Sequence, residues 1–170
     1  MIGMKMLLLG AVILTAALAM VARLRYMTAV PGRPHSGPLP ALTAEEEGLA
    51  RRLGAHIAAI ASRPHNIRHY AELEQAARYI ESELATLGYA PSAQVFNVDG
   101  RDVRNIEAVI EPADPARLRG TVVVGAHYDS FGDAPGANDN GSGTAAILEL
   151  APCSATCAAA PTCAFVSCCS

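Results

Sequence analysis

The stretch that most constrains the fold runs from Thr121 to Leu150 and reads TVVVGAHYDSFGDAPGANDNGSGTAAILEL. It opens with an apolar, β-branched run, which predicts a strand buried within a parallel sheet. A polar loop with His127 and Asp129 follows, then Asp139 in a glycine-rich turn, and a helical pattern begins at Ser142. Strand, loop and helix in this order form the first half of a βαβ unit, where ligands gather at the carboxyl end of the strand. The stretch therefore predicts a metal site built from a histidine and a carboxylate.

Each of these three residues also has a purely structural interpretation. A histidine after a strand is compatible with a hydrogen-bonded core residue, which applies to His127. Asp129 is compatible with a helix or turn cap, and Asp139 with an ordinary turn aspartate. Their order and their neighbours favour the metal site over these alternatives.

Two short motifs make the stretch more specific. Gly125–Ser130 (GAHYDS) and Gly136–Gly143 (GANDNGSG) resemble the zinc-dependent aminopeptidase family. That family also includes glutamate carboxypeptidases, glutaminyl cyclases and the transferrin-receptor ectodomain. The resemblance covers about residues 45–150. It implies an α/β fold of the zinc exopeptidase type, of which this chain holds the front part of a mixed, mostly parallel sheet flanked by helices, in truncated form.

The resemblance also implies the chemistry of the site. His127 would bind one zinc ion, and Asp139 would bridge two. Asp129 would accept the other ring N–H of His127 and so fix its tautomer. The implied reaction is hydrolysis of a peptide bond by water that two Zn²⁺ ions activate, with a peptide or aminoacyl substrate.

The turn that carries Asp139 has two further implied features. Gly136, Gly141 and Gly143 would let the backbone turn sharply beside a metal, where a Cβ would clash. Members of the family often have a cis peptide bond after the bridging aspartate, which is Asp139–Asn140 in this chain.

The family pattern stops at Leu150. In other members of the family the pattern continues with a strand that ends in two adjacent glutamates, of which one is a general base and the other a zinc ligand. A further aspartate and a histidine then follow. In this chain Glu149 is the only acidic residue after Asp139, and no histidine follows His127. We therefore expect residues 43–150 to be the N-terminal half of a peptidase domain, inactive and only partly ordered as it stands. A glutaminyl-cyclase-like acyltransferase and a catalytically dead, receptor-like binding ectodomain are the alternatives.

The last twenty residues, 151–170, contain all five cysteines and no charged residue. We interpret this tail as out-of-frame translation, with Pro152 ending the preceding helical pattern. A zinc knuckle is an alternative, although the CxxC pairs typical of such sites are missing. A disulfide-bonded tail is another, although five cysteines leave one unpaired.

The N-terminus predicts a membrane segment. Met6–Ala22 is an apolar run of 17 residues with basic residues on both sides, and that length is the lower limit for spanning a bilayer. Residues 1–25 are therefore interpreted as an anchor that holds an exported domain on the extracytoplasmic side. The alternative is a signal segment whose cleavage would release a secreted protein. Prolines and glycines over 26–42 predict an extended stalk, and the net charge of -3 gives no reason to expect nucleic acid as a partner.

Residues 43–110 predict two helices and a hairpin. Thr43 and Glu46 have the spacing of a capping box, which predicts a helix from there to about Ile60. A second helix, with an apolar face from Leu73 to Leu87, should end at Gly88 in a left-handed cap. Strands are predicted over 93–98 and 103–110, joined by a turn at Asp99–Gly100.

Besides His35, a solvated residue of the proline-rich stretch, three histidines lie outside the two motifs. His56, on the first of these helices, is expected to be a partly buried structural residue. His65 and His69 flank the start of the second helix and are expected to be solvated loop residues. A minor binding role at the edge of a substrate cleft is the alternative for these two.

Overall fold

The protein is described by a computed structural model over residues 2–33, 35–110, 120 and 122–156. The chain forms two compact units, Met1–Ala41 and Leu42–Ser170. The tail from residue 157 onward, with four of the five cysteines, lies outside the described residues, and so does the connection 111–119.

The first unit is dominated by one long helix, α1 (Ile2–Thr28). By length and composition it is apolar enough to cross a membrane, and none of it is buried within the protein. A signal sequence would pass the same test. Residues 29–33 and 35–41 form no helix or strand, as the proline-rich composition predicts, while 26–28 belong to α1 rather than to the stalk.

The second unit begins with helix α2 (Ala44–Ile60), and the predicted capping box is confirmed. The backbone N–H of Thr43 donates to Glu46 Oε2 at 2.7 Å, and the N–H of Glu46 donates to Thr43 Oγ1 at 3.2 Å. The bond from the Thr43 backbone, together with that from its side chain, lowers the pKa of Glu46. The two bonds satisfy N–H groups that the first turn of a helix leaves free.

Helix α3 (Tyr70–Thr86) and a hairpin follow as predicted. Gly88 has φ +88°, the left-handed conformation expected just past a helix end. Strands β1 (Ser92–Val98) and β2 (Arg101–Glu107) pair antiparallel, and Asp99 and Gly100 have positive φ in the turn between them. The second strand ends at Glu107 instead of Ile110, which is buried but outside the ladder.

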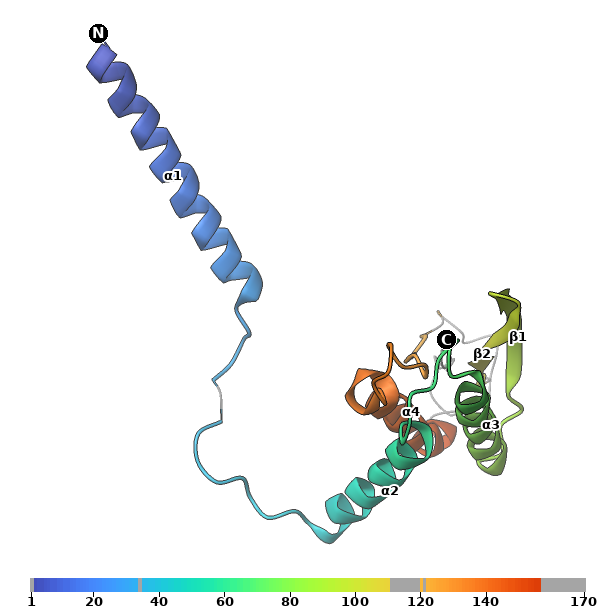
Figure 1. Cartoon of the computed structure of the whole chain (residues 1–170). Helices are drawn as coiled ribbons and strands as arrows, with labels where there is room; N and C mark the ends of the chain where they lie inside the picture. Colours follow the sequence, from blue (N-terminus) through green and yellow to red (C-terminus); the bar gives the residue numbers. More distant parts are fainter. Residues whose placement is uncertain (1, 34, 111–119, 121, 157–170) are drawn as a thin grey trace. The chain divides into compact units, whose positions relative to one another are not determined.

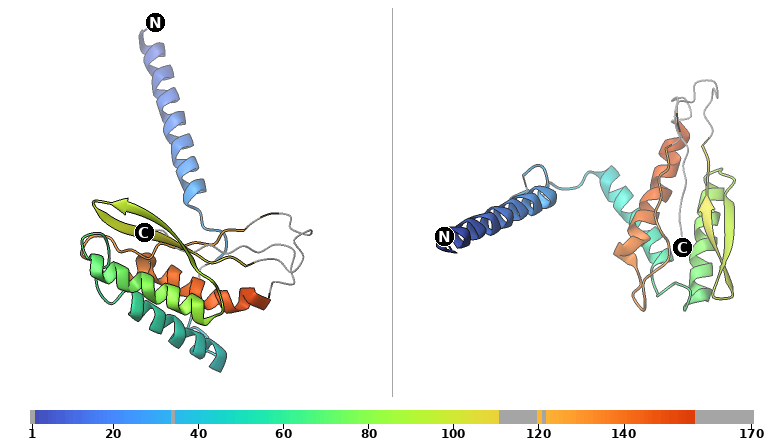
Figure 2. Two further views of the ribbon diagram at one scale, coloured as in Figure 1. Left: turned by 90° about the vertical axis from the view of Figure 1, so that its right-hand side faces the viewer. Right: turned by 90° about the horizontal axis from the view of Figure 1, so that it is seen from above.

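The core of this unit lies around α3. The hairpin lies on one side of α3, and α2 and helix α4 (Ser142–Thr156) lie on the other (Figures 1 and 2). Apolar side chains from α3, from β2 and the residues after it, and from α4 form one buried cluster, which includes Leu73, Ile80, Leu84, Ile106 and Leu148. Tyr128 belongs to the same cluster, so its burial fixes the backbone on which the neighbouring His127 and Asp129 lie.

Two further predictions about secondary structure are wrong. Val122–Val124 form no strand, and their side chains are 53%, 63% and 38% exposed. A strand needs a neighbour to bond its backbone groups, and the one sheet among the described residues contains β1 and β2 alone. Pro152 does not end the helix either, because α4 continues to Thr156. The proline costs one backbone hydrogen bond, but the preceding Ala151 is fully buried and its carbonyl accepts a bond from Tyr89 Oη at 2.6 Å, so tertiary packing outweighs the local cost.

Candidate metal site

Residues 126–130 present alternate side chains to opposite sides. Tyr128 points into the core at 1% exposure, where its hydroxyl donates to the Arg104 carbonyl at 2.8 Å. His127 and Asp129, one position away on each side, therefore face the other way. The backbone of His127 is tied to α4 as well, because Thr144 Oγ1 donates to its carbonyl at 3.2 Å. The core thus sets the direction of the two site residues.

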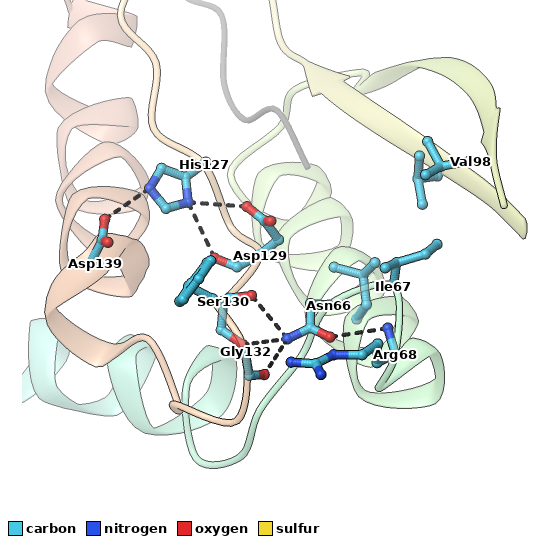
Figure 3. A pocket seen from close by; sticks show the side chains of 12 residues that line it. Asn66, Ile67, Arg68, Val98, His127, Asp129, Ser130, Gly132 and Asp139 are labelled. Atoms are coloured by element: carbon cyan, nitrogen blue, oxygen red, sulfur yellow. Dashed lines mark hydrogen bonds and ion pairs between the residues drawn. The ribbon is translucent and has the colours of Figure 1, made fainter.

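The structure brings all three predicted site residues together (Figure 3). His127 Nδ1 lies 3.1 Å from Asp129 Oδ1, and His127 Nε2 lies 3.0 Å from Asp139 Oδ1. The backbone carbonyl of Asp129 is 3.2 Å from Nδ1 as well. An Nδ1–H shared by these two oxygens would leave the Nε2 lone pair directed at Asp139. The side chains are 40%, 37% and 82% exposed for His127, Asp129 and Asp139.

The surroundings raise the pKa of His127 above its ordinary value. Partial burial by itself would lower that pKa, because it disfavours the charged ring. The Asp129 carbonyl and the carboxylates of Asp139 and Asp129 outweigh it, since each favours the imidazolium. The carboxylates of Asp129 and Asp139 therefore create a negative potential at the His127 ring, which favours a positive charge there.

The turn that presents Asp139 requires glycine at position 136 and is crowded at position 143. Gly136 has φ +70°, and a Cβ placed there would come within 2.8 Å of Ser130 Cβ. At Gly143 a Cβ would overlap the Asn140 side chain, whose Oδ1 accepts the Gly143 N–H at 3.1 Å. The Asp139–Asn140 peptide bond is cis, as the family resemblance implies.

The donor set fits part of a zinc site. Zinc in proteins takes imidazole nitrogen and carboxylate oxygen at about 2.0–2.1 Å, so two tetrahedral ligands lie about 3.3 Å apart. The 3.0 Å between His127 Nε2 and Asp139 Oδ1 is close to that spacing. Within the residues that the structure describes, no group of three or more His, Cys, Asp or Glu side chains is arranged to hold a metal ion. Two candidate ligands are thus present where a complete site needs more.

Asn66 is a residue of this site that sequence reasoning missed. It is 7% exposed, and its Nδ2 donates to the carbonyls of Ser130 and Gly132 at 2.9 and 2.7 Å. Its Oδ1 accepts the Arg68 N–H at 3.0 Å, just before α3. Asn66 therefore joins the start of α3 to the loop that follows Asp129. An asparagine shortly before a predicted helix, able to accept the backbone N–H two residues on in an Asx turn, is the signal that would have found it.

The other histidines have separate structural roles. His56 is partly buried as predicted, with Nδ1 2.7 Å from Tyr79 Oη and Nε2 3.3 Å from Glu149 Oε1. His65 is 1% exposed, so the expectation of a solvated residue is wrong. Its backbone N–H donates to Ser130 Oγ, and its Nδ1 lies 2.7 Å from the Arg63 carbonyl, so local bonds replace water.

A cavity of about 540 Å³ adjoins the three site residues. The start of α3, the hairpin and the 127–132 loop contribute its walls. Most of the wall surface is apolar, with side chains from Ile67, Leu73, Val98, Val103 and Phe131. Its polar lining comprises the site residues together with Asn66, Arg68 and Ser130. A mostly apolar cavity with a few convergent polar groups is typical of a ligand site.

Comparisons with known proteins support the family resemblance. Residues 105–163 match the model of peptidase family M28, and the match ends inside the tail that we interpret as out of frame. The chain is 48% identical over 71 residues to the probable lipoprotein aminopeptidase LpqL of Mycobacterium tuberculosis, a match that covers 42% of this chain and 13% of that protein.

Solved structures support the fold class. A Zn-dependent exopeptidase from Parabacteroides distasonis has a TM-score of 0.51 at 22% identity, and the match covers 76% of this chain and 47% of that one. A glutaminyl cyclase from Macrostomum lignano has a TM-score of 0.54 at 22% identity, covering 82% of this chain and 46% of that one. The predicted α/β class of the zinc exopeptidase type is confirmed. The chain spans just under half of each of these structures.

Proposed function

We propose that this chain, which resembles peptidase family M28 over residues 105–163, carries the histidine-bearing part of a two-zinc exopeptidase site of the aminopeptidase type. The observation that carries the proposal is the line Asp129–His127–Asp139, in which each ring nitrogen of the histidine meets one carboxylate. The substrate would be a peptide or an aminoacyl group, whose scissile bond is hydrolysed. The fold alone is shared with glutaminyl cyclases, and the aminopeptidase relatives favour hydrolysis.

In this proposal, residues of this chain orient the metal-binding imidazole and supply negative charge to the metal site. Asp129 accepts the Nδ1–H of His127, which keeps the ring in one tautomer and leaves Nε2 free to bind a metal. Asp139 supplies a carboxylate that is 82% exposed and so accessible to a second ion. Zinc, when bound, would polarise the substrate carbonyl and lower the pKa of water.

A zinc titration tests the site, and the chain offers a matched pair of controls. His69 Nε2 lies 3.3 Å from Asp133 Oδ1, and these side chains are 38% and 83% exposed, close to the values for His127 and Asp139. We expect His127→Asn and Asp139→Asn each to weaken zinc binding by at least tenfold, measured by competition with a chelating dye. His69→Asn and Asp133→Asn should leave it unchanged. Equal losses in both pairs would contradict the proposal.

The 170-residue chain on its own is proposed to be inactive. Among the described residues the site has one imidazole and one carboxylate that would bridge, and Glu149 is the only acidic residue of the 170 after Asp139. Incubation of the zinc-loaded chain with aminoacyl p-nitroanilides should give no hydrolysis above that of zinc alone. Turnover that His127→Asn abolishes would show this part of the proposal to be wrong.

The domain organisation is part of the same proposal. Residues 1–25 would anchor the protein, through the apolar run 6–22, and 26–42 would be the stalk of an extracytoplasmic domain over 43–150. Residues 151–170 would be out of frame. The name of the mycobacterial relative, a lipoprotein, is consistent with a location in the cell envelope. The extracytoplasmic location predicts that a fusion of alkaline phosphatase after residue 42 is active. The out-of-frame tail predicts that another reading frame beyond Leu150 encodes paired glutamates.

A further inference from the structure

Arg68 is a cationic residue at the candidate site to which the preceding proposal gives no role. It is the only arginine or lysine among the described residues that line the cavity beside His127 and Asp139. In Figure 3 it lies next to Asn66 and Gly132, while His127 and Asp139 lie together elsewhere on the cavity wall. The cavity therefore combines two carboxylates, an apolar wall and one guanidinium.

The position of Arg68 is fixed by its neighbours. Its backbone N–H donates to Asn66 Oδ1 at 3.0 Å, which ties it to the loop after Asp129. A Cβ at Gly132, where φ is +59°, would lie 3.5 Å from an Arg68 terminal nitrogen, so the guanidinium runs alongside that glycine. The backbone of Arg68 is thus tied to this loop, and its side chain runs beside the site with 64% of it exposed.

The guanidinium has only a weak partner within the described residues. Its nearest carboxylate oxygen, Asp133 Oδ1, is 3.8 Å away, and the Asp133 side chain is 83% exposed. Solvent screens such a pair, so it contributes little. A guanidinium presents several donors in a planar fork that matches a carboxylate with two parallel bonds. Arg68 is therefore able to exchange Asp133 for the carboxylate of a ligand.

We propose that Arg68 is a specificity-determining residue that binds a carboxylate of the substrate. The substrate class is then a short peptide with an apolar side chain for the cavity wall and a carboxylate for Arg68. This inference rests on the proposed peptidase function for the identity of the ligand. The carboxylate comes from either the peptide C-terminus or an acidic side chain, which share the chemistry that Arg68 recognises.

Binding of defined dipeptides to the full chain tests the proposal without requiring hydrolysis or zinc. The metal-free chain in a non-ionic detergent is titrated with Ala-Leu, Ala-Leu amide and Ala-Glu amide, and binding is followed by NMR of the arginine Nε–H groups. We expect Ala-Leu to bind about tenfold more tightly than its amide and to shift the Arg68 signal. If Ala-Glu amide binds as tightly as Ala-Leu, Arg68 accepts a carboxylate from an acidic side chain as well as from the peptide C-terminus. If Ala-Glu amide binds weakly, Arg68 recognises the C-terminal carboxylate alone.

Two variants with matched controls make the result specific. Arg68→Gln should remove the preference for the carboxylate, while Arg78→Gln should keep it, because Arg78 is equally exposed at 64% but does not line the cavity. Asp133→Asn should strengthen Ala-Leu binding by up to about threefold, and Glu45→Gln, which removes the same charge from α2, should not. Equal binding of acid and amide, or no binding of either, would overturn the proposal. Failure to bind zinc would instead count against the peptidase function alone.

Discussion

Replacement of Asn66 by alanine should destabilise the second unit by about 3 kcal/mol. The buried Asn66 side chain makes three well-formed hydrogen bonds, to the carbonyls of Ser130 and Gly132 and from the N–H of Arg68. Each intramolecular hydrogen bond contributes about 1 kcal/mol net, and a buried group left without a partner costs about 1–3 kcal/mol. Ser130 is itself buried, so its carbonyl would lose this donor in a place that water reaches poorly. A loss of this size is a large fraction of the stability of a small domain, which is about 5–15 kcal/mol.

Asn105 provides the matched control for Asn66. Its Nδ2 donates to Gln94 Oε1 at 3.1 Å, but its buried Oδ1 has no hydrogen-bond partner within the part of the chain that the structure describes. Asn105→Ala removes one bond and one unsatisfied oxygen, so the expected change is below about 1 kcal/mol. Because the chain has no tryptophan, urea unfolding is best followed by circular dichroism. Equal midpoints for Asn66→Ala and the unmodified chain would refute the assignment of Asn66 as the residue that joins the start of α3 to the loop after Asp129.

Three further predictions concern the charges and turns around the site. Because the pKa of His127 is raised, its ion pairs stabilise the metal-free fold fully below pH 6.5, the ordinary pKa of histidine. This contribution is lost as the pH rises through the raised pKa. An NMR titration of the ring should give a midpoint above 6.5, and a midpoint below 6.5 would contradict the geometry. Arg104→Met should cost about 2 kcal/mol by urea unfolding, because Glu74 and Glu81 lose their partly buried partner, whereas the exposed Arg78→Met should cost less than about 0.5 kcal/mol. Gly136→Ala should lower the free energy of unfolding by more than about 2 kcal/mol, because a positive φ and a 2.8 Å approach to Ser130 Cβ combine there. The loss should exceed that of Gly88→Ala, where φ is also positive but the new Cβ meets open space. Equal losses would show that the close approach carries no cost.

The sequence was informative wherever local chemistry decides the structure. The capping box at Thr43, the left-handed Gly88 and the Asp99–Gly100 turn follow from backbone preferences of a few residues, and all are present. The apolar face of α3 was predictable because burial follows helical spacing. The approach of His127 to Asp129 also followed the pattern, because residues two apart in an extended segment face the same side. The approach of Asp139 followed from the family resemblance and not from local spacing.

The errors arose where distant contacts decide the structure. Val122–Val124 have the composition of a strand, but a strand forms only where a neighbour pairs with it. Pro152 has the local signature of a helix end, yet α4 continues through it because Ala151 packs in the core. Arg68 lies far from Asp129 in the sequence and reaches the site through tertiary packing. The local signal at Asn66 likewise does not reveal its bonds to the distant Ser130 and Gly132 carbonyls.

The most direct test of the central claim is an NMR measurement of the histidine side-chain nitrogens of the full chain as zinc is added. The chain has five histidines, which a long-range ¹H–¹⁵N spectrum can separate. We predict that Nε2 of His127 moves to the chemical shift of a metal-bound nitrogen while its Nδ1 stays protonated against Asp129, and that Asp139→Asn weakens the response. A zinc response at His69 in place of His127, or binding through Nδ1 of His127, would contradict the account.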